Sequence, residues 1–188
     1  KDALIPFVDI VKERAKSDRT AFGFMPDTFY REAAFSEKLI VAANSKNGSY
    51  IGHLIFGGVF PNGRVYQVFV DPKLRKQGIA AKLFETLFDV LNSRQFTQVQ
   101  ARVASDLKAA NFLYERMGFV TRKIVDGGKT TGRRINIKVK DLEAPTLFTF
   151  VHKPAIAKDL NIPERTTARS PTYVIDLNVV FDAVKKRV

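Results

Sequence analysis

The chain has 188 residues, 45% of them hydrophobic, and this size suits one globular domain, or one domain with an appendage. It has no cysteine, which excludes disulfides and cysteine-based zinc sites and fits a reducing compartment, so we expect a cytoplasmic protein. No apolar run approaches the roughly 18–20 residues that a membrane span needs, so we expect no membrane partner. The net charge of +12 favours anionic partners such as cofactor phosphates or nucleic acid, although the basic residues are spread along the chain.

The first part of the chain predicts two helices. Apolar spacing indicates a helix from Asp2 to Lys16, with Asp2 as its N-cap. A loop is expected from Ser17 to Asp27, and a second helix from Thr28 to Glu37, with Asp27 or Thr28 as its N-cap.

Two strands joined by a tight turn come next. Lys38 to Asn44 and Ser49 to Phe60 are predicted strands, and Asn47-Gly48 is a hairpin turn. His53 has no neighbour at ligand spacing, so we expect a packed or surface histidine rather than a catalytic one. The Gly57-Gly58 pair predicts a bulge or a close backbone approach.

The stretch from Val65 to Asn92 combines a buried strand, a basic turn and an amphipathic helix. The strand is Val65 to Val70, Asp71-Pro72 ends it, and Gly78 lies where the helix opens. The first N–H groups of a helix have no partner within it and the helix dipole favours anions there, so a phosphate or pyrophosphate suits this turn. On this stretch alone, an ordinary strand–turn–helix with solvated basic residues is an equal alternative.

The second half of the domain predicts a strand, a helix and a two-stranded hairpin: Phe96 to Val103, Asp106 to Met117, then Phe119 to Val125 with Arg133 to Val139. Ser105 or Asp106 is the expected N-cap, and Gly118 the left-handed residue that ends the helix. Because a helix joins them, the strands Val65–Val70 and Gln98–Val103 should be parallel neighbours.

Two motifs carry a family resemblance. Arg75, Gly78 and Ala80, after a strand and opening a helix, fit the pattern Arg/Gln-x-x-Gly-x-Gly/Ala. Ala109 to Phe119 is a helix with a Tyr four residues before Gly-Phe. Together they resemble the GNAT superfamily, the acyl-CoA-dependent N-acetyltransferases, over roughly Ala3 to Leu142. The resemblance implies a domain at residues 1–143 with an α/β (α+β) fold: a mixed, mostly antiparallel sheet, flanked by helices and splayed between its parallel strands.

The resemblance further implies an enzyme that moves an acetyl group from acetyl-CoA, its co-substrate, to an amine by direct attack, without a metal. The positions that would bind the cofactor are Val68, Phe69, Val70, Arg75, Lys76, Gln77, Gly78, Ile79 and Ala80. Tyr114 matches the residue that often protonates the departing sulfur, so we expect it to be catalytic. A tyrosine that only packs on the sheet is the alternative.

Two positions depart from the family pattern. Leu107 stands where many relatives have Asn, and Arg102 where several place a carboxylate base. The general base therefore stays open among Asp71, Glu32 and a water relay from Tyr66 or Gln67. The identity of the acceptor also stays open: an amine-bearing small molecule, a protein or aminoacyl-RNA. The chain could also form a homodimer.

The tail differs from a plain acetyltransferase. Residues 144–170 are expected to form a linker, with a short strand at Leu147 to Val151. Residues 171–188 carry Asp176, Asn178 and Asp182 in a pattern that resembles the first strand and helix of PIN-domain nucleases; a terminal strand with incidental carboxylates is the alternative. We expect a fragment of a longer acetyltransferase–nuclease, with no metal at Asp176. We also expect Tyr173 to Ile175 to be disordered or borrowed as a strand by a neighbouring molecule.

The alternative function belongs to a different class. A catalytically reduced domain could keep the phosphate-binding turn, recognise acyl-CoA or RNA, and regulate an attached PIN-like nuclease. Tyr114 favours the enzyme, whereas the departures at Leu107 and Arg102 favour the binding module.

Overall fold

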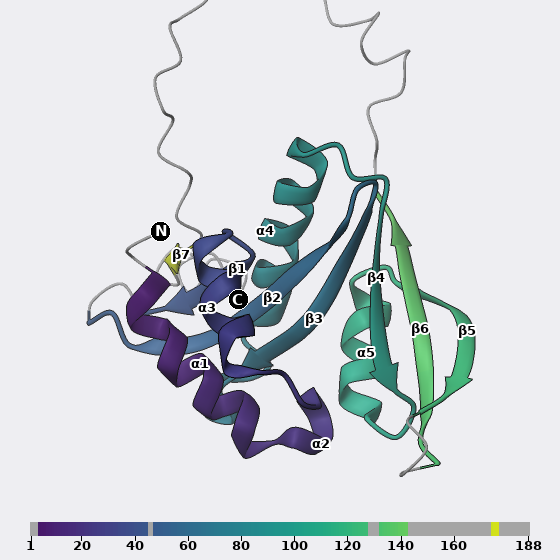
Figure 1. The fold of residues 1–188 in the computed structure, drawn as a ribbon, viewed down its shortest axis with the longest axis horizontal. Coiled ribbons are helices and arrows are strands. Elements are labelled where there is room, and N and C mark those ends of the chain that lie inside the picture. The colour runs from purple at the N-terminus through teal and green to yellow at the C-terminus, as the bar shows by residue number, and fades with distance from the viewer. Residues whose placement is uncertain (1–3, 45–46, 128–131, 143–173, 177–188) are drawn as a thin grey trace, which may run out of the picture.

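The computed structural model describes residues 4–44, 47–127, 132–142 and 174–176, and its centre is a single seven-stranded sheet (Figure 1). The strands are β1 (Leu39–Ala43), β2 (Tyr50–Val59), β3 (Asn62–Val70), β4 (Gln98–Ala104), β5 (Val120–Asp126), β6 (Arg134–Asp141) and β7 (Val174–Asp176). Their order is β5-β6-β4-β3-β2-β1-β7. The pairs β3–β4 and β1–β7 are parallel and all the others are antiparallel, which confirms the predicted mixed, mostly antiparallel sheet.

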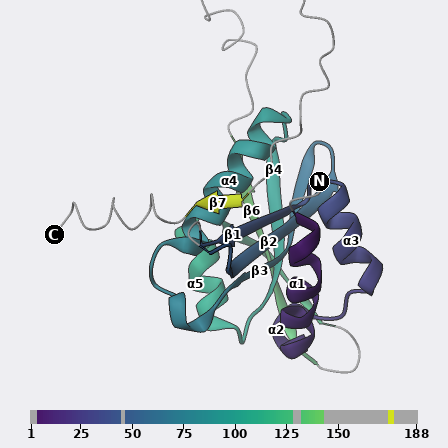
Figure 2. The same cartoon turned by 90° about the vertical axis from the view of Figure 1, so that its left-hand side faces the viewer.

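Helices cover the two faces of the sheet (Figure 2). They are α1 (Ile5–Ser17), α2 (Arg19–Phe22), α3 (Asp27–Phe35), α4 (Ile79–Ser93) and α5 (Lys108–Arg116). The "α4 face" carries α4 and α5 over a core of strand residues such as Leu54, Val65 and Val103. The "α1 face" carries α1 and α3 over Val41 and Ile55. The apolar stripe of α4 buries its side chains against the first of these cores, as its spacing predicts.

Several helix boundaries differ from the predictions. The first helix begins at Ile5 after Leu4, while Asp2 lies outside the described residues. The expected loop contains α2, because the side chain of Asp18 accepts a hydrogen bond from the N–H of Ala21 at 3.0 Å and caps it. In α3 the N-cap is Pro26, so neither Asp27 nor Thr28 caps it.

The third helix and the fifth helix lose their predicted caps to ion pairs. Asp27 lies in the first turn of α3 and its carboxylate contacts Lys16 of α1 at 2.9 Å. At α5 the N-cap is Leu107, and Asp106 binds Arg133 at 2.7 Å instead of capping the helix. In both cases the local sequence pattern predicts that a carboxylate caps the helix, but a basic side chain from another segment binds that carboxylate instead.

The parallel strands β3 and β4 stay together only at their beginnings. They pair from Asn62–Gln98 to Val65–Ala101 and then part, as Figure 1 shows. This confirms that they are parallel neighbours and that the sheet is splayed between them. We call the separation of Tyr66–Val70 from Arg102–Ala104 the splay.

The tail returns to the same sheet. Val174, Ile175 and Asp176 pair in parallel with Val41, Ala42 and Ala43 of β1. The expectation that this segment would be disordered or borrowed by a neighbouring molecule is therefore wrong for Val174 and Ile175: β7 gives β1 a strand partner on its otherwise open edge. The predicted linker at 144–170 and its strand at Leu147 to Val151 lie outside the described residues. Within the described ranges no helix is long and apolar enough to cross a membrane.

Candidate functional site

The turn that follows β3 is shaped by short-range contacts. The side chain of Asp71 accepts a hydrogen bond from the N–H of Lys73 at 2.9 Å and starts a 3₁₀ turn at Pro72–Leu74. The backbone then takes left-handed conformations at Lys76 (φ 64°) and at Gly78 (φ 80°). These reversals bring the chain directly to the first turn of α4, with Gly78 as its N-cap.

The first turn of α4 is suited to an anion. Its N-cap offers no side-chain hydrogen bond, and the turn contains no acidic residue, so the N–H groups of its first residues have no protein acceptor from a cap. A Cβ placed on Gly78 would meet no atom within 4 Å, so the space beside this backbone is open for a ligand. The helix dipole and the exposed side chains of Arg75 and Lys76 add positive potential. This turn therefore fits a pyrophosphate.

The end of β3 supplies a free backbone edge. Beyond Val65 no described strand pairs with the side of β3 that faces β4, which leaves peptide groups of Val68–Val70 available to a ligand. One of them is already used, because the carbonyl of Val70 accepts a hydrogen bond from Nε of Arg75 at 3.1 Å. Arg75 thus ties the turn to the end of the strand.

The predicted cofactor residues fall into two groups by side-chain burial. Lys76, Gln77 and Gly78 are exposed or half-buried along the turn, beside Ala80 in the first helical turn. Ile79 and Val70 are buried in the core, and Phe69 packs its ring against Tyr50 and His53. The buried group can therefore contribute to a ligand mainly through its backbone. All of these residues lie on one continuous path from the splay to α4.

Tyr114 lies on the α4 face in an aromatic cluster. Its ring is 5.3 Å from that of Phe84 and 5.1 Å from that of Phe119, both edge-to-face, and the residue is 5% exposed. Burial raises the pKa of the Tyr114 phenol above its ordinary value. Among the described residues its hydroxyl has no hydrogen-bond partner, so the group is protonated and uncommitted, as a proton donor must be.

A polar network that the sequence did not suggest fixes the position of α5. The side-chain amide of Asn111 donates to the carbonyls of Ala104 and Leu107 at 2.8 and 3.0 Å. Its oxygen accepts from Asn136 at 2.8 Å, and Asn136 accepts from Ser105 at 2.8 Å. The network joins the end of β4, the start of α5 and β6, so it holds the helix that carries Tyr114. Because its members come from separate elements, no local spacing predicts it.

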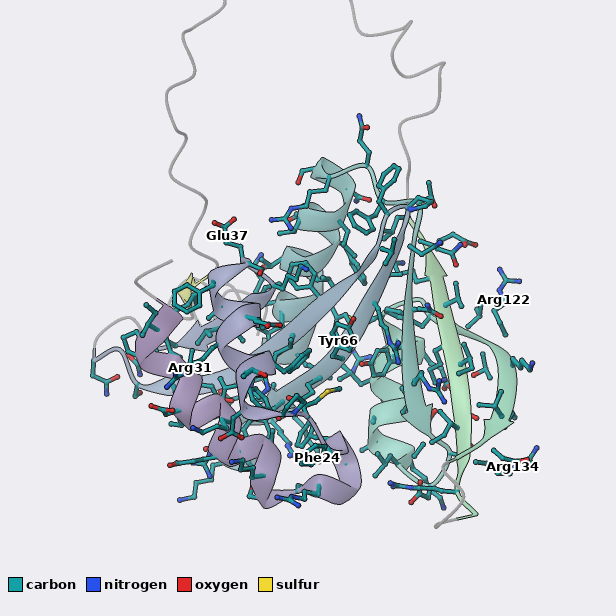
Figure 3. All side chains as sticks on the ribbon, viewed as in Figure 1. Phe24, Arg31, Glu37, Tyr66, Arg122 and Arg134 are labelled. Carbon is teal, nitrogen blue, oxygen red and sulfur yellow. The ribbon has the colours of Figure 1, made fainter. Side chains whose placement is uncertain are left out.

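Tyr66 lies at the start of the splay. A β-bulge in the β2–β3 ladder falls here, because Ile55 pairs with Gln67 whereas Phe56 pairs with Val65. Tyr66 and the buried Gln67 consequently both face the α1 side of the sheet, where Gln67 donates to the hydroxyl of Tyr30 at 3.4 Å. Figure 3 shows the side chain of Tyr66 beside the parting strands.

Gly57 and Gly58, the pair that predicted a bulge, lie on β2 near Tyr66 of β3. Gly57 pairs with Arg64 and Gly58 with Gly63 in regular register, so the bulge is at Tyr66 of the partner strand and not at the glycines. The predicted close approach is present, because a Cβ on Gly58 would lie 2.3 Å from the carbonyl oxygen of Asn62.

His53 is a core residue. It is fully buried on the α1 face, with Nδ1 hydrogen-bonded to the hydroxyl of Tyr50 at 2.5 Å. Burial lowers the pKa of His53 to about 4, and the neighbouring Gln67 opposes this shift. This position agrees with the packed histidine expected from the sequence.

Comparison with known proteins identifies the family. The model of the acetyltransferase (GNAT) family matches residues 9–119, more than half of the chain. No curated protein sequence matches. Solved structures also share the fold at low identity. The ribosomal-protein-S18-alanine N-acetyltransferase from Escherichia coli is 23% identical with a TM-score of 0.53, covering 65% of this chain and 81% of its own. NAA60 from Arabidopsis thaliana, in complex with a bisubstrate analogue, is 16% identical with a TM-score of 0.60, covering 71% and 92%.

The third structure is the NatC complex bound to Gag peptide and CoA, 22% identical with a TM-score of 0.56, covering 63% of this chain and 81% of its own. At these identities the structures show the fold alone, and the family model carries the assignment. The match runs from within α1 to just past the end of α5, and therefore includes both the turn before α4 and Tyr114. The chain belongs to the GNAT acetyltransferase family.

Proposed function

We propose that this chain transfers an acetyl group from acetyl-CoA to the amine of a polypeptide, by direct attack of the amine. The observation that carries the proposal is the continuity of two features: the splay that opens after Val65 and Ala101, and the uncapped first turn of α4 at Gly78. A nucleotide diphosphate at that turn and a peptide-like arm along Val68–Val70 match the chemistry of coenzyme A. When bound, acetyl-CoA supplies an acyl thioester.

The chain's residues have three tasks in this proposal. The backbone of Lys76 to Ala80 holds the pyrophosphate, and the free edge of β3 at Val68–Val70 orients the arm and polarises the acyl carbonyl. Tyr114 donates the proton of its hydroxyl to the leaving sulfur, and its raised pKa keeps that proton in place until then. Phe84 and Phe119 exclude water around the Tyr114 ring.

The amine must reach the site unprotonated. A lysine amine has an ordinary pKa near 10.4 and an α-amine one of about 7.7–8.0, so an α-amine has the larger neutral fraction at neutral pH. Arg102 stands at the start of the splay, and a fixed positive charge beside a bound amine lowers the pKa of that amine. The candidate bases are Asp71, Glu32 and a water relay from Tyr66 or from Gln67, whose side chain is buried.

The polypeptide acceptor is supported by the likeness in fold. The name of the Escherichia coli enzyme gives a ribosomal protein as its substrate, and the NatC complex is bound to a peptide. We extend this acceptor class to the present chain because both structures share its fold.

The test is turnover of acetyl-CoA against a panel of amines. Peptides with free and blocked N-termini, lysine-containing peptides and small amines are each incubated with acetyl-CoA, and free thiol and product mass are measured. Acetylated peptide with an increase of one acetyl group supports the proposal. Stabilisation of the fold by acetyl-CoA without any acetylated product would instead favour the binding module.

A further inference from the structure

We propose that the acceptor is a polypeptide with acidic side chains next to its reactive amine, selected by Arg64 and Arg102. This rests on the proposed function and specifies the substrate of the same site. Two residues follow the last β3–β4 pair: Tyr66 on β3 and Arg102 on β4. They stand on either side of the point where the strands part.

Both residues face the side of the sheet that carries α1. Tyr66 packs against the core under α1 and α3. Arg102 lies between Ala101 and Val103, whose side chains belong to the core under α4, so alternation places Arg102 on the opposite face. The α4 face is closed here by Phe84, Tyr114 and other core residues, so within the described part of the chain the splay is open to an acceptor from the α1 face.

Arg64 adds a second cation on that face. It precedes the inward-facing Val65, and its guanidinium lies over the ring of Tyr66 at 5.3 Å from the centroid. The register pairs it with Gln100, two residues before Arg102, so the two arginines are diagonal neighbours on adjacent strands. Two planar guanidinium groups at this spacing suit carboxylate ligands.

The surface continues across β6 and β5. Two cross-strand rows lie side by side on the α1 face: Arg64–Gln100–Val139–Val120 and Arg102–Ile137–Lys123. No described helix covers these rows, and their valine and isoleucine side chains are half-buried or exposed. An apolar strip bordered by cations is longer than a small amine needs and fits an extended acidic segment.

The charges of this surface are not neutralised within the described part of the chain. Arg64, Arg102 and Lys123 have no ion-pair partner there, and the carboxylate of Asp141 at the far end of β6 is 3.4 Å from Arg122. The surface thus presents unpaired positive charge next to the splay. A carboxylate in place of Arg102 would have favoured acceptors with basic side chains.

The experiment compares matched peptides that share a free N-terminal residue. One continues with Asp and Glu, and the other with the isosteric Asn and Gln. At low salt we expect the acidic peptide to have about three- to tenfold higher kcat/KM, the range that partly exposed ion pairs support, and the preference to shrink at high salt. Arg102→Gln should weaken this preference, because Arg64 remains, and Arg102→Glu should abolish it.

Arg134→Glu is the control, since it makes the same charge change. Arg134 precedes Ile135 on β6 and faces the opposite side, and Figure 3 shows it far from Tyr66. It should keep the acidic preference. Thermal unfolding confirms that each variant is folded, and fluorescence anisotropy of both peptides, with coenzyme A present, measures the same preference without turnover.

The outcomes separate this inference from the proposed function. Equal kcat/KM for acidic and neutral peptides overturns the inference and leaves acetyl transfer intact. If there is no turnover but the acidic peptide binds preferentially and this preference depends on Arg102, the proposed function is overturned. The inference that this surface binds acidic peptides is then supported. If an RNA oligonucleotide of equal charge binds more tightly than the acidic peptide, and Arg102→Glu removes this binding, the ligand of the surface is nucleic acid and the inference of an acidic peptide is overturned.

Discussion

The ring of Tyr66 lies where a side chain on Gly57 would stand, with the Tyr66 Cε2 atom 2.8 Å from the place of that Cβ. The two residues are on adjacent strands, and the bulge at Tyr66 turns its ring over the glycine. The edge of Phe29 closes on the ring from α3, with centroids 5.3 Å apart, and Arg64 lies over it. Gly57 therefore fixes where the Tyr66 ring lies at the start of the splay.

Gly57→Ala should weaken acceptor use without unfolding the chain. The added methyl group pushes on the outer part of a side chain rather than on backbone, so the Tyr66 ring shifts and the strands stay paired. We expect acceptor kcat/KM to fall several-fold, while acetyl-CoA affinity is unchanged. In a Tyr66→Ala background the same change should have almost no further effect on kcat/KM. Additive losses would show that Gly57 acts independently of Tyr66.

Gly78→Val should abolish stabilisation by acetyl-CoA. Acetyl-CoA at 100 times its Kd should stabilise the parent by about 2.7 kcal/mol in thermal unfolding. At φ 80° a β-branched residue strains the turn, and its side chain fills the open space where a phosphate would bind. Gly48→Val is the matched control, because Gly48 has φ 66° and equally open surroundings in the distant hairpin. Equal ligand stabilisation in both variants would contradict the assignment of this turn.

Tyr114→Phe should lower turnover by roughly 10²–10⁴-fold if proton donation limits the rate. Acetyl-CoA affinity should stay the same, because the ring keeps its contacts with Phe84 and Phe119. Since burial raises the pKa of the phenol, the parent should not lose activity through Tyr114 ionisation as the pH rises towards 10. Single-turnover kinetics of both proteins measure the loss. Equal rates under conditions where chemistry is rate-limiting would leave Tyr114 a packing residue.

The path from β3 through the turn to α4 could be predicted from sequence, because each of its features is local. A strand pattern, a stop at Asp71-Pro72 and a glycine before an amphipathic stripe follow one another within a few residues. The parallel β3–β4 pair followed from the helix between the strands, since such crossovers join parallel neighbours.

The features that escaped prediction depend on contacts between distant segments. Asp106 has the local pattern of a cap, yet its carboxylate binds Arg133 on the approach to β6. Gly57 predicted a close approach of the backbone, but no feature of the sequence indicates that the bulge lies on the facing strand at Tyr66. Three residues of the tail pair with β1, a contact that spans most of the chain and leaves no spacing signal.

His53 should make the fold sensitive to acid. Its pKa is about 4 in the folded chain against an ordinary 6.5, so the unfolded chain binds the proton first as the pH falls. Its neutral form therefore contributes stability above about pH 6.5 that is lost as the pH falls towards 4, in total about 3 kcal/mol. His53→Asn, which keeps an acceptor near Nδ1, should lose less stability between about pH 7 and pH 4.5 in urea unfolding.

The last prediction concerns Lys138, which is fully buried on β6 beside α5. Its ammonium group donates to Glu115 at 2.9 Å and to the hydroxyl of Thr121 at 3.1 Å. Glu115→Ala leaves a buried cation with one neutral partner and should cost about 1–3 kcal/mol in free energy of unfolding. Lys138→Met removes the charge together with its desolvation cost, so the double variant should be more stable than Glu115→Ala alone. Because Glu115 follows Tyr114 on α5, turnover should fall in Glu115→Ala and recover in the double variant.

An exposed pair of similar geometry provides the comparison. Lys82 and Glu85 on α4 are 3.2 Å apart, with both side chains about half exposed to water. Water solvates either partner when the other is removed, so Glu85→Ala should cost less than about 1 kcal/mol. Chemical denaturation of the four variants under one buffer condition gives these differences. If Glu115→Ala and Glu85→Ala lose equal stability, the ammonium group of Lys138 reaches water in solution, and the contact does not hold α5 in place.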